Sequence, residues 1–545
     1  MSTLSYYGKK LQHLCNALFL YLACLCQSTC FLISCFHKFI LFRVHKFFAQ
    51  LFYFIFISIF GFWILTILKP RSDFTPRNLD LFFTSASAVT VSSMSTVEME
   101  VFSNSQLILI TFLMLVGGEI FTSMLGLHLI RPKFKPWRKN SKIESVISST
   151  TTSPRNSNFS DDIELDIVVI PDSPKPNLEN DEFQDDFGSS NTQTLKYQSI
   201  KFLGVVTLVY LLVINILGIS SVLVYFACVS SAKEVLRNKG LKTLTFAIFT
   251  VVSTFVSCGF VPTNENMMVF SKNSGLLLIL IPQVLFGNTL YPTFLRLSIR
   301  FLGKIFKKRE AKYLLKRSRE IGHLHLLPSQ HSRLLVVTVF GFIMVQFILF
   351  CSLEWKSSVL SGLNSYQKVV GSLFQVVNTR HTGETIVDIS TVAPAMLVVF
   401  VVMMYLPPYT SFVPVKGVEE TPEEAVGESK GRGKVAESLI LSQLSYLFLF
   451  IVVICIIERK RMKDDPLNFN VLNITLEVIS AYGNVGFSTG YSCDRLINPD
   501  TTCKNKSYGF VGKWSDEGKI IIIIVMFFGR LKKFNMQGGK AWKLL

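Results

Sequence analysis

Four short stretches of small and polar residues, far apart in the chain, align with one another on a single position. That position is a serine in the first stretch, Ser93, and a glycine in the other three, Gly259, Gly383 and Gly486. Glycine permits unusual backbone dihedrals and leaves carbonyl oxygens accessible. A ring of such oxygens can replace the hydration shell of an alkali cation. The pattern therefore predicts a cation pathway, provided that the four stretches surround one axis.

The residues before each aligned position keep the same register in all four stretches. Ten residues upstream stands a large apolar residue: Phe83, Phe249, Leu373 and Leu476. Six residues upstream stand Ser87, Ser253, Val377 and Ser480. Two residues upstream stand Val91, Ser257, His381 and Asn484. Four such units in one register indicate an internal repeat.

Long apolar runs flank each stretch and set the class of the protein. The chain has 545 residues, of which 50% are hydrophobic and 17% charged, against about a quarter charged in soluble domains. Runs of about 18 or more apolar residues are typical of membrane-spanning helices. The expected spans are 47–68, 107–130, 202–228, 275–295, 334–353, 393–412, 439–457 and a short one at 519–529. A soluble protein with one very large core is the weaker alternative.

The sequence thus predicts an all-α polytopic membrane protein with four membrane–pore–membrane repeats around a pseudo-fourfold axis. Eight helices span the lipid bilayer, and four re-entrant pore loops lie between them. Backbone that is not helical is tolerated at membrane depth only if it lines a water-filled path or is buried in protein. The expected repeats are A (47–130), B (199–302), C (333–416) and D (436–533). Between and around them lie an N-terminal segment (1–46), cytosolic loops at 131–198, 303–332 and 417–435, and a C-terminal tail (534–545).

The charge pattern predicts the orientation. A net charge of +18 would suggest nucleic acid as the partner of a soluble protein. Here Lys and Arg gather beside apolar runs, so we expect no nucleic-acid partner. The basic segments 131–142 and 304–319 and the charged segment 417–434 fall on one side, which the positive-inside rule assigns to the cytosol together with both termini. The basic segment 459–463 falls on the other side and disagrees with the rule. The N-terminal segment also resembles a signal peptide, but a retained segment is favoured because a better helix follows.

The quoted stretches resemble one known family. The four are 87-SAVTVSSMSTVEMEVFSN-104, 253-STFVSCGFVPTNENM-267, 372-SLFQVVNTRHTGETIVD-388 and 477-EVISAYGNVGFSTGYSC-493. They resemble the pore loops of plant HKT transporters, of the Trk/Ktr/HKT superfamily, as do 115-LVGGEIFTS-123, 281-IPQVLFGNTLYP-292 and 404-MYLPPYT-410. The resemblance runs from about 47 to 530. It implies one pore per chain, a plasma-membrane location and Ser93, Gly259, Gly383 and Gly486 as the selectivity filter. It implies no cofactor; a homodimer is left open.

A serine at the first filter position resembles the sodium-selective branch of the family. The resemblance therefore implies passive, channel-like conduction of Na⁺. A sodium–potassium symporter or a potassium uptake transporter of the same fold is the alternative, with K⁺ as cargo. From other classes, a membrane-embedded hydrolase would need a nucleophile–base or metal constellation, and a scaffold would need no pore.

Further residues have roles that follow from their places. Three carboxylates, Glu98, Glu100 and Glu265, follow aligned positions and are expected at the external mouth, where carboxylates concentrate cations. A solvated loop or a helix cap is the alternative for each.

Arg530 ends the last apolar run, and the resemblance implies an electrostatic barrier there, with interfacial snorkelling as the alternative. Arg380 is expected to pair with Glu384 behind the filter. Glu119, inside the second span, must have a partner or face water. In the last external loop we expect a disulfide between Cys493 and Cys503 and a glycosylation sequon at Asn505.

Overall fold

The computed structural model of the protein describes residues 46–72, 74–131, 189–410, 443–496 and 509–535. The N-terminal segment up to residue 45, most of the loops 131–198 and 417–435 and the tail beyond 535 lie outside these residues.

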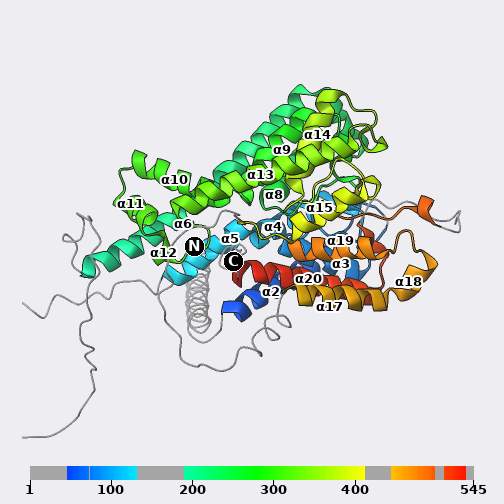
Figure 1. Ribbon diagram of the computed structural model, residues 1–545. Coiled ribbons are helices and arrows are strands. Elements are labelled where there is room, and N and C mark those ends of the chain that lie inside the picture. Colours follow the sequence, from blue (N-terminus) through cyan, green and yellow to red (C-terminus); the bar gives the residue numbers. More distant parts are fainter. Residues whose placement is uncertain (1–45, 73, 132–188, 411–442, 497–508, 536–545) are drawn as a thin grey trace, which may run out of the picture.

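The described helices follow one another along the chain in the order of the four expected repeats (Figure 1). Repeat A contains α2 (Lys46–Ile67), α3 (Asn78–Thr90), α4 (Asn104–Gly117) and α5 (Glu119–Ile130). Repeat B contains α6 (Ser189–Cys228), α7 (Ser230–Asn238), α8 (Thr243–Phe255), α9 (Ser274–Gly287) and α10 (Tyr291–Ile305). Repeat C contains α13 (Ser329–Glu354), α14 (Ser365–Asn378) and α15 (Pro394–Tyr405). Repeat D contains α17 (Gln443–Ile457), α18 (Arg459–Asp464), α19 (Val471–Gly483) and α20 (Asp516–Asn535). The all-α prediction is confirmed.

The short helices α3, α8, α14 and α19 correspond to the four stretches predicted as pore loops and are called the pore helices below. Helices α3 and α19 end three residues before the aligned position, α8 ends four residues before it and α14 five residues before it. Buried residues dominate their C-terminal halves, as in α8, where every residue from Phe249 to Phe255 is buried. A short helix that is wrapped by other helices places its C-terminal end inside the protein, where the polar loop that follows is shielded from lipid.

The second helices of repeats A and B are broken, whereas continuous spans were predicted at 107–130 and 275–295. The axis turns by 55° between α4 and α5 and by 81° between α9 and α10. Glycines mark both breaks, because Gly117 and Gly287 lie directly against the backbone carbonyls of Val89 and Phe255 at the ends of the pore helices. Any Cβ at these two positions would overlap those carbonyls. Gly529 in α20 makes the same approach to Tyr482 of α19.

The lengths of the apolar helices indicate a membrane protein but do not establish the number of its membrane-spanning helices. Helices at Phe47–Ile67, Thr194–Cys228 and Ser329–Glu354 are long and apolar enough to cross a bilayer, and each bent pair adds one more if it is a single span. Helices α15 and α17 are shorter, and α20 carries Lys519 and Arg530. Eight spans therefore stay a prediction.

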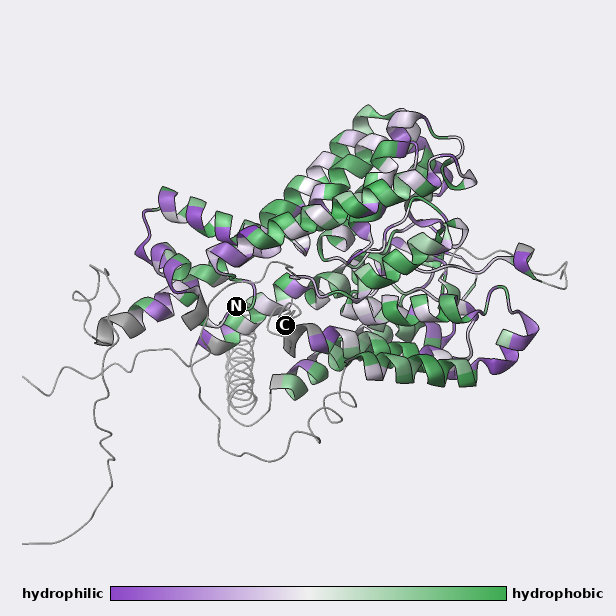
Figure 2. Cartoon of the chain, in the orientation of Figure 1, coloured by the Kyte–Doolittle hydropathy of each residue, from purple (hydrophilic) through white to green (hydrophobic). Residues whose placement is uncertain are grey.

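The bundle has two polar ends and an apolar middle (Figure 2). Helix α18 lies at one end, and the basic helix α11 (Arg309–Lys316) and the short helix α12 (Ser318–Ile321) lie at the other (Figure 1). Large apolar side chains such as Phe56 (71% exposed) and Phe448 (69% exposed) point away from the middle of the bundle. Their exposure fits a lipid surrounding, since soluble proteins rarely expose extended apolar patches.

Polar contacts join neighbouring repeats at the end where α18 lies. Between repeats D and A, Lys519 Nζ lies 2.7 Å from Asp80 Oδ1, with side chains only 2% and 10% exposed. Between C and D, Arg495 donates to Ser390 Oγ over 2.6 Å. Between B and C, the Met267 backbone N–H donates to the Thr385 carbonyl over 3.1 Å. Breaking a buried ion pair such as Lys519–Asp80 by removing one partner costs about 3–5 kcal/mol.

Candidate cation pathway

Three of the four pore helices end in the same backbone motif. The residue two positions before the aligned one has a left-handed conformation in Val91 (φ 52°), Ser257 (φ 61°) and Asn484 (φ 50°). The next N–H then reaches back along the helix, from Ser92 to the Ser87 carbonyl (2.8 Å) in repeat A. Equivalent bonds are Cys258 to Ser253 (2.8 Å) and Val485 to Ser480 (3.0 Å). Such bonds satisfy helix carbonyls that would otherwise lack a partner.

The left-handed residue is unusual in repeat A. Val91 is β-branched, and β-branched residues rarely take positive φ. Holding such a residue there costs about 1–3 kcal/mol, which persists only where the surroundings impose it. Val91 is 1% exposed, so the packing around the first loop imposes this conformation.

The four aligned residues share a positive φ. The values are 52° at Ser93, 91° at Gly259, 69° at Gly383 and 95° at Gly486. Three of the positions are therefore glycine for a conformational reason, whereas Ser93 holds the same conformation with a side chain.

The structure brings these four residues together. A Cβ on Gly259 would overlap the Thr382 carbonyl of repeat C and would lie 3.4 Å from Ser93 Oγ of repeat A. A Cβ on Gly383 would overlap the Val485 carbonyl of repeat D, and one on Gly486 would overlap Ser93 Cβ. Each of the three aligned glycines thus lies against the loop of a neighbouring repeat, and the backbone carbonyls of Thr382, Val485 and Ser92 lie beside them.

Serine hydroxyls six residues upstream hold two of these loops. Ser253 Oγ accepts from the Gly259 N–H, and Ser480 Oγ accepts from the Gly486 N–H, each over 3.0 Å. Repeat C has Val377 at this place, and there the Gly383 N–H donates to the Asn378 carbonyl over 3.1 Å instead. In repeat A, the Ser87 hydroxyl is buried without a partner among the described residues. Loop A is therefore fixed differently from loops B and D.

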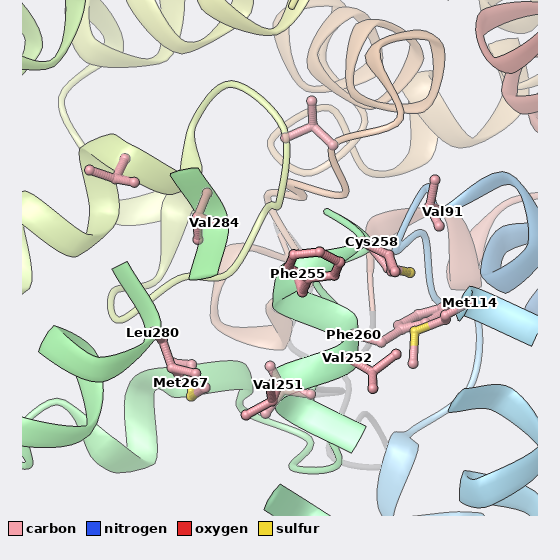
Figure 3. Close-up of a cluster of buried hydrophobic side chains, with 14 of the residues drawn as sticks. Val91, Met114, Val251, Val252, Phe255, Cys258, Phe260, Met267, Leu280 and Val284 are labelled. Atoms are coloured by element: carbon pink, nitrogen blue, oxygen red, sulfur yellow. The ribbon is translucent and has the colours of Figure 1, made fainter. Parts of the chain in front are cut away.

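Apolar side chains anchor the loops from behind. Cys258 and Phe260, on either side of Gly259, are at most 2% exposed. Figure 3 shows both in one cluster with Val91 and Met114 of repeat A. This packing leaves little room for the loop backbone to move.

The expected pair between Arg380 and Glu384 is not formed. Arg380 Nη2 donates to the Pro407 carbonyl over 2.7 Å, and its guanidinium lies 5.0 Å from the centre of the Phe342 ring. Glu384 accepts from the Thr254 hydroxyl of repeat B over 2.5 Å. Both side chains are buried and hold the loop of repeat C, but through separate partners.

Two of the three carboxylates expected at the mouth share one lysine. Lys239 Nζ lies 2.8 Å from Glu100 Oε1 and 2.5 Å from Glu265 Oε2. Asn264 reinforces the contact, because its backbone N–H donates to the Glu100 carboxylate over 3.1 Å. Burial lowers the pKa of Lys239, but hydrogen bonds to Glu100 and Glu265 outweigh this and raise it overall, so the ammonium stays charged at neutral pH. Glu98 lies directly before the 3₁₀ turn Met99–Val101 and is partly exposed.

Arg530 lies deep inside the protein. Its side chain is 1% exposed, Nη2 donates to the Gly117 carbonyl, and the guanidinium lies 5.7 Å from the Phe54 ring centre. A snorkelling side chain would reach water, so this burial argues against the interfacial alternative.

Glu119 lies close to a buried histidine. Its Oε1 lies 3.8 Å from His325 Nε2, and the charge of Glu119 also acts on Arg530. His325 Nδ1 lies 2.9 Å from the Tyr409 hydroxyl, and its ring packs on Tyr291. The loop before α13 thus reaches the breaks of the second helices in repeats A and B and the residues after α15 in repeat C. No local spacing predicts this contact, although glycine and proline residues mark the breaks.

Cys493 is disulfide-bonded. Its expected partner, Cys503, and the expected glycosylation site, Asn505, lie outside the described residues.

Comparison with known proteins decides the family. The TrkH family, described as "Cation transport protein", matches residues 180–413 and 418–536. The chain belongs to this family. It is 51% identical over 484 residues to "Sodium transporter HKT1" of Arabidopsis thaliana, covering 88% of this chain and 91% of that protein. It is 47% identical over 502 residues to "Cation transporter HKT1;3" of Oryza sativa subsp. japonica, covering 91% of each. Both relatives place the chain among the plant-HKT-type members of the TrkH family.

A solved TrkH structure, "Potassium Transporter TrkH from Vibrio parahaemolyticus", covers 91% of this chain and 85% of its own, with TM-score 0.47 and 14% identity. The TrkH-family chain is a multi-pass membrane protein that transports cations, and it is not an enzyme. The hydrolase alternative is therefore rejected.

Proposed function

We propose that this transporter conducts Na⁺ selectively and passively, through a filter formed by Ser93, Gly259, Gly383 and Gly486. One observation supports the proposal above all. The four aligned residues all have a positive φ, and they lie against the loops of neighbouring repeats. A dehydrated cation in the centre would be coordinated by the backbone oxygens around it.

Selectivity for sodium would come from Ser93, the one filter residue of the four that is not glycine. Ser93 adds a methylene and a hydroxyl to a ring of glycines, directly against Gly486. The added group narrows and reshapes the ring, which disfavours the larger K⁺. The relatives named as sodium and cation transporters are consistent with this assignment.

The test is electrophysiology of the full chain in an expressing cell, with Na⁺ or K⁺ as the only permeant external cation. We expect current with Na⁺ and little with K⁺. Equal currents would overturn sodium selectivity in favour of potassium uptake, and a sodium current that needs K⁺ in the same solution would favour symport.

We further propose that the protein lies in the plasma membrane with both termini in the cytosol. The support is that the basic helix α11 lies at one end of the bundle, which the positive-inside rule assigns to the cytosol. On this topology, the cluster of Lys239, Glu100 and Glu265 is the external mouth, and Arg530 is a barrier on the cytosolic side of the filter. The loop with Cys493, Cys503 and Asn505 is then external. An epitope at either terminus should be reached by antibody only after the cells are permeabilised.

A further inference from the structure

Helix α10 has two exposed stripes that the cation pathway does not use. Leu297, Phe301 and Ile305 stand four residues apart and are 54–63% exposed, and Phe306, just beyond the helix, is 61% exposed. Arg300 and Lys304, also four residues apart, run beside this apolar stripe and are exposed, as are Lys307 and Lys308 after the helix. Residues four apart share one face of a helix.

The opposite face of α10 fixes it to the protein. Tyr291, Leu295 and Ile299 are buried. The Arg296 guanidinium donates to the Leu315 and Leu327 carbonyls, each over 3.1 Å. The exposed stripes therefore belong to a helix that is held in place, not to a mobile segment.

The course of α10 is that of a helix along the membrane surface. The axis of α10 is turned by 81° from the axis of the apolar helix α9. Its N-terminal turn is joined to the start of α13, where Ser332 Oγ and Thr293 Oγ1 lie 3.0 Å apart. Only five residues further along α13, Val337 is 66% exposed in the apolar part of that helix. Helix α10 thus begins about one to two turns of helix from the apolar band.

The charge of this surface indicates which kind of partner binds to it. Between Arg296 and Arg317 the chain carries nine Lys and Arg residues and one Glu. An apolar stripe bordered by basic side chains is the pattern of helices that lie in the interface of anionic membranes. A second copy of the chain fits less well, because a twofold contact would place this basic row against itself.

We propose that α10 is an interfacial helix that binds anionic phospholipid headgroups of the adjacent leaflet. Arg300, Lys304, Lys307 and Lys308 contact the headgroups, and the stripe of Leu297, Phe301 and Ile305 enters the acyl-chain boundary with Phe306. On the topology proposed above, this is the cytosolic leaflet; the lipid contact itself depends neither on that topology nor on which ion is transported.

The surface is also connected to the base of the cation pathway. Arg296 of α10 bonds the carbonyl of Leu327, two residues after His325, which contacts Glu119 and Tyr409. A headgroup bound on α10 therefore holds a helix that in turn holds the loop beneath the filter.

The test is lipid binding by the full chain, purified in neutral detergent and titrated with phosphatidylserine or phosphatidylcholine, with bound lipid counted by native mass spectrometry. We expect salt-sensitive retention of phosphatidylserine, and at least about tenfold weaker retention when Arg300, Lys304, Lys307 and Lys308 are all changed to Gln. The matched control changes Arg459, Lys460 and Lys463 of α18 to Gln, which removes exposed basic residues from the opposite end of the bundle.

Equal retention by the α10 variant and the wild type would overturn the proposal. So would a fall in oligomeric mass of the α10 variant without loss of lipid, since that would assign the surface to a second copy. A second variant, Phe301→Ser with Phe306→Ser, keeps every charge. We expect this variant to retain less phosphatidylserine than the wild type after extraction from phosphatidylcholine vesicles that contain phosphatidylserine. Melting temperatures of all variants show whether each is folded. No measurement in this test uses ion flux, so the lipid result does not depend on whether the transporter is sodium-selective.

Discussion

The Lys239 ammonium lies 2.8 Å from the Glu100 carboxylate, although the two residues come from different repeats. The same ammonium binds Glu265, so two carboxylates that the sequence places after aligned residues are not free to attract cations. The side chains are 21–37% exposed, so water screens the cluster and each pair contributes at most about 1 kcal/mol to stability. The effect of Lys239 on the entering cation is therefore the more informative quantity.

Replacing Lys239 by Met should increase the attraction of the mouth for cations. The cluster changes from one net negative charge to two. At a separation of about 10 Å in water, one charge alters the energy of a cation by about 0.4 kcal/mol, or about twofold in occupancy. We expect the half-saturating external Na⁺ concentration to fall by about that factor at low ionic strength, and the difference to shrink as salt is raised.

Lys239→Arg keeps the charge and is the control. Because hydrogen bonds to the two carboxylates raise the pKa of Lys239 overall, the wild-type cluster should behave alike from mildly acidic to mildly basic pH, and lose its ammonium only as pH rises through that raised pKa. Identical sodium dependence in Lys239→Met and Lys239→Arg would exclude an electrostatic role.

Two substitutions at Ser93 separate its bulk from its hydroxyl. Ser93→Gly should raise permeation of K⁺ relative to Na⁺ by about fivefold, the factor that corresponds to one net polar contact of about 1 kcal/mol. Ser93→Ala keeps the Cβ that lies against Gly486. If bulk sets selectivity, the alanine variant stays sodium-selective; if the hydroxyl does, it behaves like the glycine variant. Reversal potentials in mixed solutions give the ratio, and no change in either variant would remove Ser93 as the discriminator.

Gly486→Ala should abolish sodium flux without unfolding the bundle. The new Cβ would overlap Ser93 Cβ and lie 2.9 Å from the Ser92 carbonyl, and a side chain at φ 95° costs about 1–3 kcal/mol. Gly341→Ala in α13 is the matched control, because nothing lies within 4 Å of that Cβ. Flux per folded protein should be lost in the first and kept in the second. Full flux in Gly486→Ala would speak for a pathway elsewhere.

Much of the fold could be predicted from the sequence because apolar runs and small polar residues carry local signals. The expected stretch at 244–260 corresponds to α8 at Thr243–Phe255 followed by its loop, and the stretch at 471–487 to α19 at Val471–Gly483 followed by its loop. The register of Ser93 with the three glycines was also visible, because it reflects a repeated need for positive φ.

Contacts between repeats could not be predicted in the same way. Lys239 is 139 positions from Glu100, and His325 is 206 from Glu119, so no local spacing connects them. The break between α9 and α10 was missed because the apolar run continues through it, although Gly287 and Pro292 mark its place. Arg380 was assigned to its neighbour in sequence, whereas packing directs it to Pro407.

Arg530 and Glu119 should have opposite effects on flux. Arg530 is buried against the Gly117 carbonyl, and Glu119 offsets its charge. A single positive charge about 6 Å from a passing cation, at an effective dielectric constant of about 20, raises its energy by about 3 kcal/mol, and the neighbouring carboxylate cancels part of this. Arg530→Gln should therefore raise sodium flux per folded protein, by on the order of tenfold, whereas Glu119→Gln should lower it. Lys460→Gln, which removes a basic residue exposed on α18, serves as the control. If both residues serve only to hold the helix breaks together, both variants will show less folded protein and unchanged flux per molecule. Opposite changes in flux at equal melting temperature require the charge itself to act on the ion.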